Sequence, residues 1–183
     1  MRKLSGQDLL AQYAEGQRNF TDLEIAEANL FEANLPNIDF ARSNLQKAYL
    51  PYANLSNANL QEVQLGAAQL SDARLSQVNL TKANLQKANL SRANLRYANL
   101  REANLSGADL QRADLSFADL RDANLEQADL RRVNLDRANL KGAKLGGANL
   151  FNAQNAELEN ALLDANTIDP DGYRQLSNEE CEE

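Results

Sequence analysis

Hydrophobic residues recur at every fifth position through most of this chain. From residue 20 to residue 150, each of the 27 positions divisible by five holds a large apolar side chain, and Leu occupies all of them from Leu45 onward. The residue two places earlier is small, with Ala at 20 of the 25 positions between Ala28 and Ala148. A polar residue, usually Asn or Asp, stands between the two, so the sequence is an internal repeat of the form A-[N/D]-L-x-x.

A period of five residues fits neither regular secondary structure. On an α-helix, successive leucines would be rotated by about 140° and would scatter around the cylinder. On one long strand, the odd spacing would send alternate leucines to opposite faces. The pattern instead predicts extended triplets, with the Ala and the Leu pointing inward, joined by two-residue polar corners. The central Asn or Asp suits hydrogen bonds to backbone groups at turns and side-chain ladders between coils.

These units resemble those of the pentapeptide-repeat family over residues 20–150 without interruption. The resemblance implies an all-β fold, a right-handed quadrilateral parallel β-helix in which four pentapeptides complete each coil. The stretch from Leu9 to Phe20 is similar to the segment that precedes the repeats in cyanobacterial members. Residues one coil apart are then expected to stack above one another at a spacing of about 4.8 Å.

Residues 1–19 are expected to form a short N-terminal helical cap. Ser5 and Asp8 are spaced as in a capping box, although Asp stands where Glu or Gln is usual. Leu9 and Tyr13 lie four residues apart, as on one face of a helix, and Gly16 is a typical C-terminal stop. Such a helix would cover the end of the leucine column in the first coil.

The β-helix is predicted over 20–168, with a break near 151–155. Eight residues separate Leu150 from Leu158, which we interpret as three inserted residues in a bulged loop. Residues 169–183 are expected to form a turn and an acidic tail. The triplets expected to follow the break are Ala156-Glu157-Leu158, Ala161-Leu162-Leu163 and Asn166-Thr167-Ile168.

The composition excludes several classes of active site. The chain has no His and a single Cys, which rules out a His-based catalytic triad, a His-ligated zinc and a cysteine cluster. Stacked carboxylates such as Asp109 and Asp129 lack the cleft and the desolvated partner that acid–base catalysis needs. Neither a phosphate-binding glycine loop nor a calcium-binding pattern is present. The sequence therefore predicts no enzyme activity, no cofactor and no metal ion.

The net charge of −7 is concentrated at the C-terminal end. Residues 20–150 carry 15 basic and 15 acidic side chains, whereas residues 151–183 carry one basic and nine acidic ones. A basic footprint for nucleic acid is missing, so no direct nucleic-acid binding is expected. The sequence has no apolar run typical of a signal peptide or a membrane span, which predicts a cytoplasmic protein without membrane contact.

Function is expected on the outer surface, where one corner of the predicted rod carries three stacked arginines and the next corner carries an aromatic pair. Aromatic residues and arginines are enriched at protein interfaces. The alternative interpretation is that Asp114 and Asp136 neutralise the arginines and that the aromatic rings only cover strand edges. The candidate protein-binding patch consists of Arg92, Arg96, Tyr97, Arg112, Phe117 and Arg132.

Two functions remain open at the level of the sequence. The first is a non-enzymatic interaction or scaffold module with a protein partner, either monomeric or a weak end-to-end or side-by-side dimer. The second is a DNA mimic that regulates DNA gyrase, as the resemblance implies from the fluoroquinolone-resistance members. The balanced charge of residues 20–150 favours the first, because mimicry of DNA needs an acidic rod.

Overall fold

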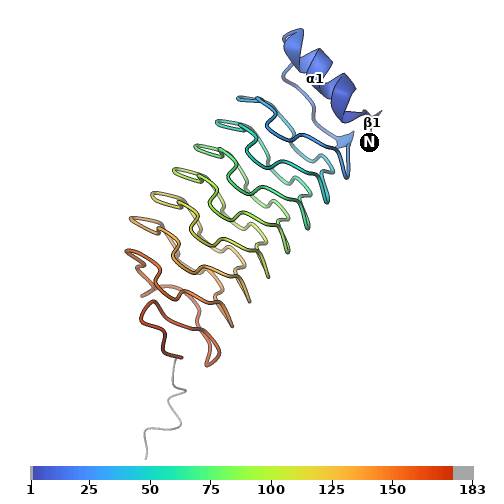
Figure 1. Ribbon diagram of the computed structural model, residues 1–183. Helices are drawn as coiled ribbons and strands as arrows, with labels where there is room; N and C mark the ends of the chain where they lie inside the picture. Colours follow the sequence, from blue (N-terminus) through green and yellow to red (C-terminus); the bar gives the residue numbers. More distant parts are fainter. Residues whose placement is uncertain (1, 175–183) are drawn as a thin grey trace, which may run out of the picture.

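The computed structural model describes residues 2–174 and shows a rod of stacked coils with a helix at its N-terminal end (Figure 1). β1 (Arg2–Lys3) pairs in parallel with β2 (Leu23–Glu24), with Arg2 opposite Leu23. The expected acidic tail from Ser177 to Glu183, which includes Cys181, lies outside the described residues. The named elements are β1 (Arg2–Lys3), α1 (Gly6–Ala14) and β2 (Leu23–Glu24).

Most coils are joined to the next by isolated parallel bridges. The bridging residue is the polar centre of each triplet, and its partner lies 20 residues further along, from the pair Asn19 and Asp39 to the pair Asn134 and Gln154. Because the repeat is five residues long, this offset places four triplets in every coil. The predicted four-sided parallel β-helix is confirmed for this part of the chain.

The inward positions form a continuous apolar core along the rod. Every large apolar residue at the fifth positions from Phe20 to Leu150 is buried, with at most 3% of its surface exposed. Burial of each leucine contributes about 1.5–3 kcal/mol before the cost in conformational entropy. Ser43 is polar but satisfied, because its hydroxyl donates to the Phe20 carbonyl at 2.9 Å and accepts from the Leu23 N–H at 3.0 Å.

The corners explain why Asn or Asp stands before most of the leucines. The carboxamide oxygen of Asn44 accepts a hydrogen bond at 3.0 Å from the N–H of Gln46, the first corner residue. The second corner residue has a left-handed backbone even when it is bulky, with φ of 59° at Arg92 and 61° at Phe117. A β-turn hydrogen bond closes the corners that follow Ile25 to Leu150, as from the Ala93 N–H to the Leu90 carbonyl at 3.0 Å. These bonds offset the strain of about 1–2 kcal/mol that a left-handed L-residue carries.

Helix α1 begins and ends as its sequence predicts. Ser5 is the N-cap, and its hydroxyl accepts from the Asp8 N–H at 3.1 Å. Gly16, with φ of 98°, follows the last turn. Leu9 is completely buried against the core, and the Tyr13 hydroxyl donates to the Pro36 carbonyl at 2.7 Å. The helix therefore packs on the N-terminal end of the β-helix through one apolar and one polar anchor.

The regular spacing ends after Gln154, at the end of the segment where the break was expected. Gln154 still pairs with Asn134 at the usual offset of 20 residues, so residues 151–154 do not form a bulged loop. The next bridge joins Lys144 to Leu162, at an offset of 18. This coil is thus two residues shorter than the others. The triplet that ends at residue 155 is followed directly by the next triplet, without the two-residue corner between them. The eight-residue spacing that we interpreted as an insertion corresponds to this missing corner.

The last triplet is also displaced from the expected frame. Ile168 pairs with Asn149, so it takes the outward central position that Asn or Asp holds elsewhere. Thr167 is the inward residue, and its buried hydroxyl donates to the Leu145 carbonyl at 2.9 Å. The expected triplet Asn166-Thr167-Ile168 is therefore wrong by one position. Ile168 also forms an antiparallel bridge with Arg174, which adds a short return of the chain at the C-terminal end.

Asp164 replaces a backbone acceptor at this irregular coil. One oxygen of its carboxylate accepts from the Gly147 N–H at 2.8 Å and from the Asn166 N–H at 3.0 Å. The same oxygen lies 2.9 Å from the Thr167 hydroxyl, whose single proton it shares with the Leu145 carbonyl. These hydrogen bonds, led by that of Gly147, hold the pKa of the Asp164 carboxyl below its ordinary value of 3.8. The charged carboxylate therefore ties the last coil to the one before it.

Acidification is expected to loosen this last coil. Because the folded-state pKa of Asp164 is lowered, its stabilising effect is complete above pH 3.8 and is lost as the pH falls through the folded-state value. The measurement is hydrogen exchange of the Gly147 amide by NMR as the pH is lowered from above 3.8 to below the folded-state pKa of Asp164. Asp164→Asn keeps the acceptor oxygen but cannot titrate, so its Gly147 amide should lose this acid-dependent exchange. The same acid response in that variant would contradict the assignment.

Candidate interaction surface

An aromatic stack occupies one corner of the rod, flanked by two arginines. The rings of Tyr97 and Phe117 lie one coil apart with centroids separated by 4.8 Å and planes inclined by 16°. The guanidinium carbon of Arg96 lies 5.7 Å from both ring centroids, and that of Arg137 lies 5.3 Å from the Phe117 centroid. These distances allow cation–π attraction. We call Arg96, Tyr97, Phe117 and Arg137 the aromatic corner.

The two rings differ in exposure. Tyr97 is 52% exposed, whereas Phe117 is half-buried beneath its neighbours. Phe117 is covered in part because Tyr97 stacks on one face and Arg137 lies over the ring from the next coil. The accessible part of this corner is the Tyr97 ring and the edges of the stack.

The arginine column, which consists of Arg92, Arg112 and Arg132, lies on the neighbouring corner. Arg92 is bound from below by Asp72 through two hydrogen bonds of 2.7 and 2.6 Å. The hydrogen bonds from Arg92 lower the pKa of the Asp72 carboxyl. Within residues 2–174, neither Arg112 nor Arg132 forms an ion pair. Among the residues that the structure describes, the column therefore presents two guanidinium groups without an ion-pair partner beside one that is neutralised.

The acidic residues between the two corners neutralise the arginines only in part. Asp114 Oδ2 lies 3.6 Å from Arg96 Nη1. This ion pair between partly exposed groups adds little stability. Asp136 forms no ion pair with any described residue. Arg131, the neighbour of Arg132 at its corner, reaches around that corner, and its Nη2 lies 2.6 Å from Asp129 Oδ2. The structure thus brings together Arg96, Tyr97 and Phe117, and places the arginine column at the other edge of the face.

A second group of aromatic residues, near the N-terminal end of the rod, was not predicted from the sequence. Phe31, Tyr49 and Tyr52 are all exposed, and Phe31 lies 6.0 Å from Tyr49 and 6.1 Å from Tyr52 between ring centroids. We call these three residues the N-terminal aromatic cluster. A signal was present in the sequence, because Tyr49 occupies a central position that normally holds Asn or Asp.

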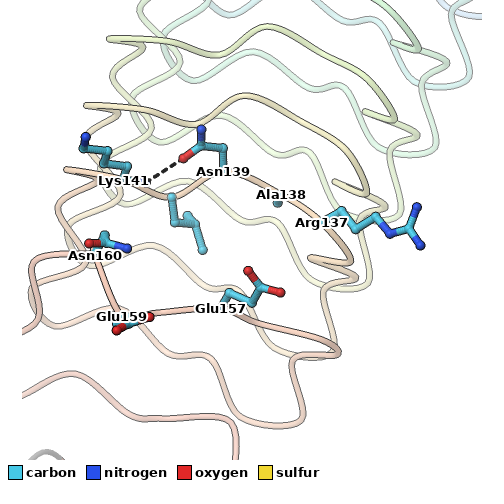
Figure 2. A pocket seen from close by; sticks show the side chains of 8 residues that line it. Arg137, Ala138, Asn139, Lys141, Glu157, Glu159 and Asn160 are labelled. Carbon is cyan, nitrogen blue, oxygen red and sulfur yellow. Dashed lines mark hydrogen bonds between the residues drawn. The ribbon is translucent and has the colours of Figure 1, made fainter.

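The short coil opens a groove of 490 Å³ near the C-terminal end (Figure 2). Within the described residues, the N–H of Leu140 has no backbone acceptor, whereas the equivalent N–H of Leu135 pairs with Gln154 and that of Leu145 pairs with Leu162. The irregular spacing thus leaves a gap in the wall of the coil. The residues that line it are Arg137, Ala138, Asn139, Leu140, Lys141, Glu157, Glu159 and Asn160.

The described surface contains carboxylates that are held in their charged form. Asp119 accepts two hydrogen bonds from Arg121, at 2.8 and 2.6 Å, and these lower the pKa of its carboxyl. Such groups act as acceptors and are poor proton donors at neutral pH. Among residues 2–174, no cluster of three or more side chains could hold a metal ion. The same part of the chain has no helix with the length and apolar character needed to cross a bilayer.

Comparisons with known proteins agree on the repeat. A family model described as pentapeptide repeats matches the chain in eight copies, over residues 24–61, 58–96, 88–127 and 113–150. HetL, a pentapeptide repeat protein involved in heterocyst differentiation regulation from the cyanobacterium Nostoc, is 30% identical, and the match covers 94% of this chain and 100% of HetL with a TM-score of 0.42. A search of the curated proteins gave no match.

Other solved structures show the same relationship. A pentapeptide repeat protein from the cyanobacterium Cyanothece is 28% identical, with 88% of this chain and 98% of that chain covered and a TM-score of 0.38. QnrB1, a plasmid-mediated fluoroquinolone resistance protein, is 19% identical over 86% of this chain and 82% of its own, with a TM-score of 0.69, which is a likeness of fold alone. Because the family model spans residues 24–150, which is more than half of the chain, the chain belongs to the pentapeptide-repeat family.

Proposed function

We propose that this chain is a non-enzymatic protein-interaction module that binds its partner through the aromatic corner and the arginine column. The observation that carries the proposal is the stack of Tyr97 on Phe117 between two arginines, at corner positions where the repeat mostly holds polar residues. The rod that presents it is inferred to wind right-handed, as parallel β-crossovers do.

The arrangement of the aromatic corner favours binding for two physical reasons. The Tyr97 ring is held by stacking and by Arg96, so little side-chain freedom remains to be lost when a partner docks. Tyr and Arg are also the residue types that contribute most to binding energy when they become desolvated at an interface. A rigid solenoid face fixes the spacing between this corner and the arginines on the next one.

The DNA-mimic alternative has weaker support. The fold likeness to QnrB1 is compatible with it, but the two chains are only 19% identical. The carboxylates that could imitate phosphates are partly neutralised by arginines, as Asp129 is by Arg131 and Asp119 by Arg121. A rod whose repeat carries equal numbers of basic and acidic residues lacks the acidic field that such mimicry requires.

Phe117→Ser is expected to weaken partner binding about tenfold or more while leaving stability nearly unchanged. The substitution removes the ring on which Tyr97 stacks, so the aromatic corner loses its shape, but the left-handed corner backbone remains. Binding is measured by quantitative capture from a lysate of the source organism, followed by titration with the captured protein. Thermal unfolding of the same sample reports on stability.

Gln77→Ser is the matched control, because Gln77 is an exposed residue in the same column with the same left-handed backbone. It should bind as the wild type does. If Phe117→Ser unfolds the protein, the stack is structural. If it retains every partner at wild-type affinity, the interaction surface lies elsewhere.

A further inference from the structure

One corner column of the rod changes its charge along its length. Its members are exposed or half-buried, lie one coil apart and share a left-handed backbone with φ between 53° and 59°. The half nearer the N-terminus is acidic and aromatic, and the other half is basic. We call this set the segregated column, and its members are Glu32, Tyr52, Asp72, Arg92, Arg112 and Arg132.

Three of the five charges of the segregated column lack an ion-pair partner among the described residues. Asp72 and Arg92, which meet at the middle, form a two-point ion pair with a shortest distance of 2.6 Å. Among residues 2–174, no ion pair forms at Glu32 near one end, nor at Arg112 or Arg132 near the other. Tyr52 is 54% exposed. The column therefore offers unmatched groups of opposite character at its two ends.

We propose that a second copy of this chain docks side by side and antiparallel along the segregated column. Coils repeat at about 4.8 Å in both copies, so the two columns keep a common register over their whole length. Glu32 then lies opposite Arg132 of the second copy, and the central Asp72 lies opposite Arg92. The Tyr52 ring lies opposite Arg112, which is a cation–π pairing. Each contact occurs twice, as a two-fold axis requires.

Other arrangements of the same two columns bring like charges together. A parallel dimer puts each residue against its own copy, so three arginines face three arginines. An antiparallel dimer shifted by one coil puts either Asp72 against Asp72 or Arg92 against Arg92. Like charges that face each other across an interface repel, and this repulsion disfavours the wrong arrangements. The antiparallel register is thus the one that satisfies every member of the column.

The neighbouring column supports the same register. The two-fold axis lies perpendicular to both rods. Each column beside the segregated column therefore faces the same column of the second copy. Phe31, an exposed ring of the N-terminal aromatic cluster, then faces Arg131, and Ser71 faces Ser91. None of these contacts places like charges together, and two exposed rings, Phe31 and Tyr52, become covered. Since only one edge of each rod takes part, the dimer belongs to the weak class that buries a small area.

This inference goes beyond the proposed function, although both proposals use the three arginines of the arginine column. The aromatic corner lies on the next corner of the rod, and Phe117→Ser leaves the segregated column intact. Glu32, in turn, lies outside the proposed partner-binding patch. Failure of one proposal therefore leaves the other to be decided by its own variant.

The test uses charge reversal in the full chain, followed by sedimentation velocity at low ionic strength up to about 1 mM, the range that detects weak dimers. Glu32→Arg and Arg132→Glu should each reduce the association constant at least about tenfold, because each change turns two symmetry-related attractions into repulsions. The double variant should recover dimerisation. Neither side chain forms a hydrogen bond or ion pair in the described structure, so the fold should tolerate all three.

Lys87→Glu is the matched control. It changes the charge by the same amount at an exposed residue in a different corner column, and it should leave the association constant unchanged. The proposal is overturned if the wild type remains monomeric over the whole concentration range. It is also overturned if the single reversals have no effect, or if the double variant dimerises no better than either single one.

Discussion

Leu105→Asp is expected to lower the free energy of unfolding by about 4 kcal/mol or more, the largest expected effect of a single substitution in this protein. Leu105 is completely buried in the column between Leu85 and Leu125, so a carboxylate there has no water and no partner. Because each coil is supported only by its neighbours, disruption of one layer also weakens the coils on both sides. Urea unfolding followed by far-UV circular dichroism measures the change.

Lys87→Asp serves as the control for this experiment. Lys87 is an exposed corner residue, and the residues above and below it, Ala67 and Gly107, carry no charge. Asp is among the residues that tolerate the left-handed backbone found there, with φ of 57°. Its effect should be within about 0.5 kcal/mol, as is usual at a surface site. Equal losses of stability in the two variants would refute the assignment of inward and outward positions.

Leu9→Asp is expected to detach helix α1 and to destabilise the N-terminal end by about 3 kcal/mol or more. Leu9 is the one residue of α1 that is fully buried, and it packs against the apolar end of the core. Loss of this contact should uncover apolar surface on the first coil and promote self-association. Hydrogen exchange over residues 6–20 reports the detachment, and light scattering reports the association.

The adjacent residue supplies a control on the same helix. Leu10 is 37% exposed, so Leu10→Asp replaces an apolar side chain that water already reaches. That variant should keep the protection of α1 and remain as dispersed as the wild type. If both variants release the helix, the loss reflects a weakened helix and not a lost anchor.

The repeat is sufficient to predict the buried columns, and the resemblance to pentapeptide-repeat proteins adds the four-sided coil. The start and end of α1 are predicted separately, from Ser5 and Gly16. A five-residue period leaves only one way to place Ala and Leu inside together, and local hydrogen bonds then explain the Asn or Asp and the helix cap. The same period predicts which residues share a corner, and it correctly stacked Tyr97 on Phe117. These features depend on backbone geometry that every repeat shares.

Other features depend on contacts that the period does not specify. A corner arginine reaches along its column, as Arg92 does to Asp72, or around the corner, as Arg131 does to Asp129, according to which carboxylate lies nearest. The half-burial of Phe117 likewise results from side chains one coil away. At the irregular coil, the frame was decided by Asp164 and Thr167 taking over backbone hydrogen bonds. These features are properties of the assembled rod. Contacts between side chains of different coils, and the local loss of backbone hydrogen bonds between coils, arise only when residues distant in the sequence are brought together.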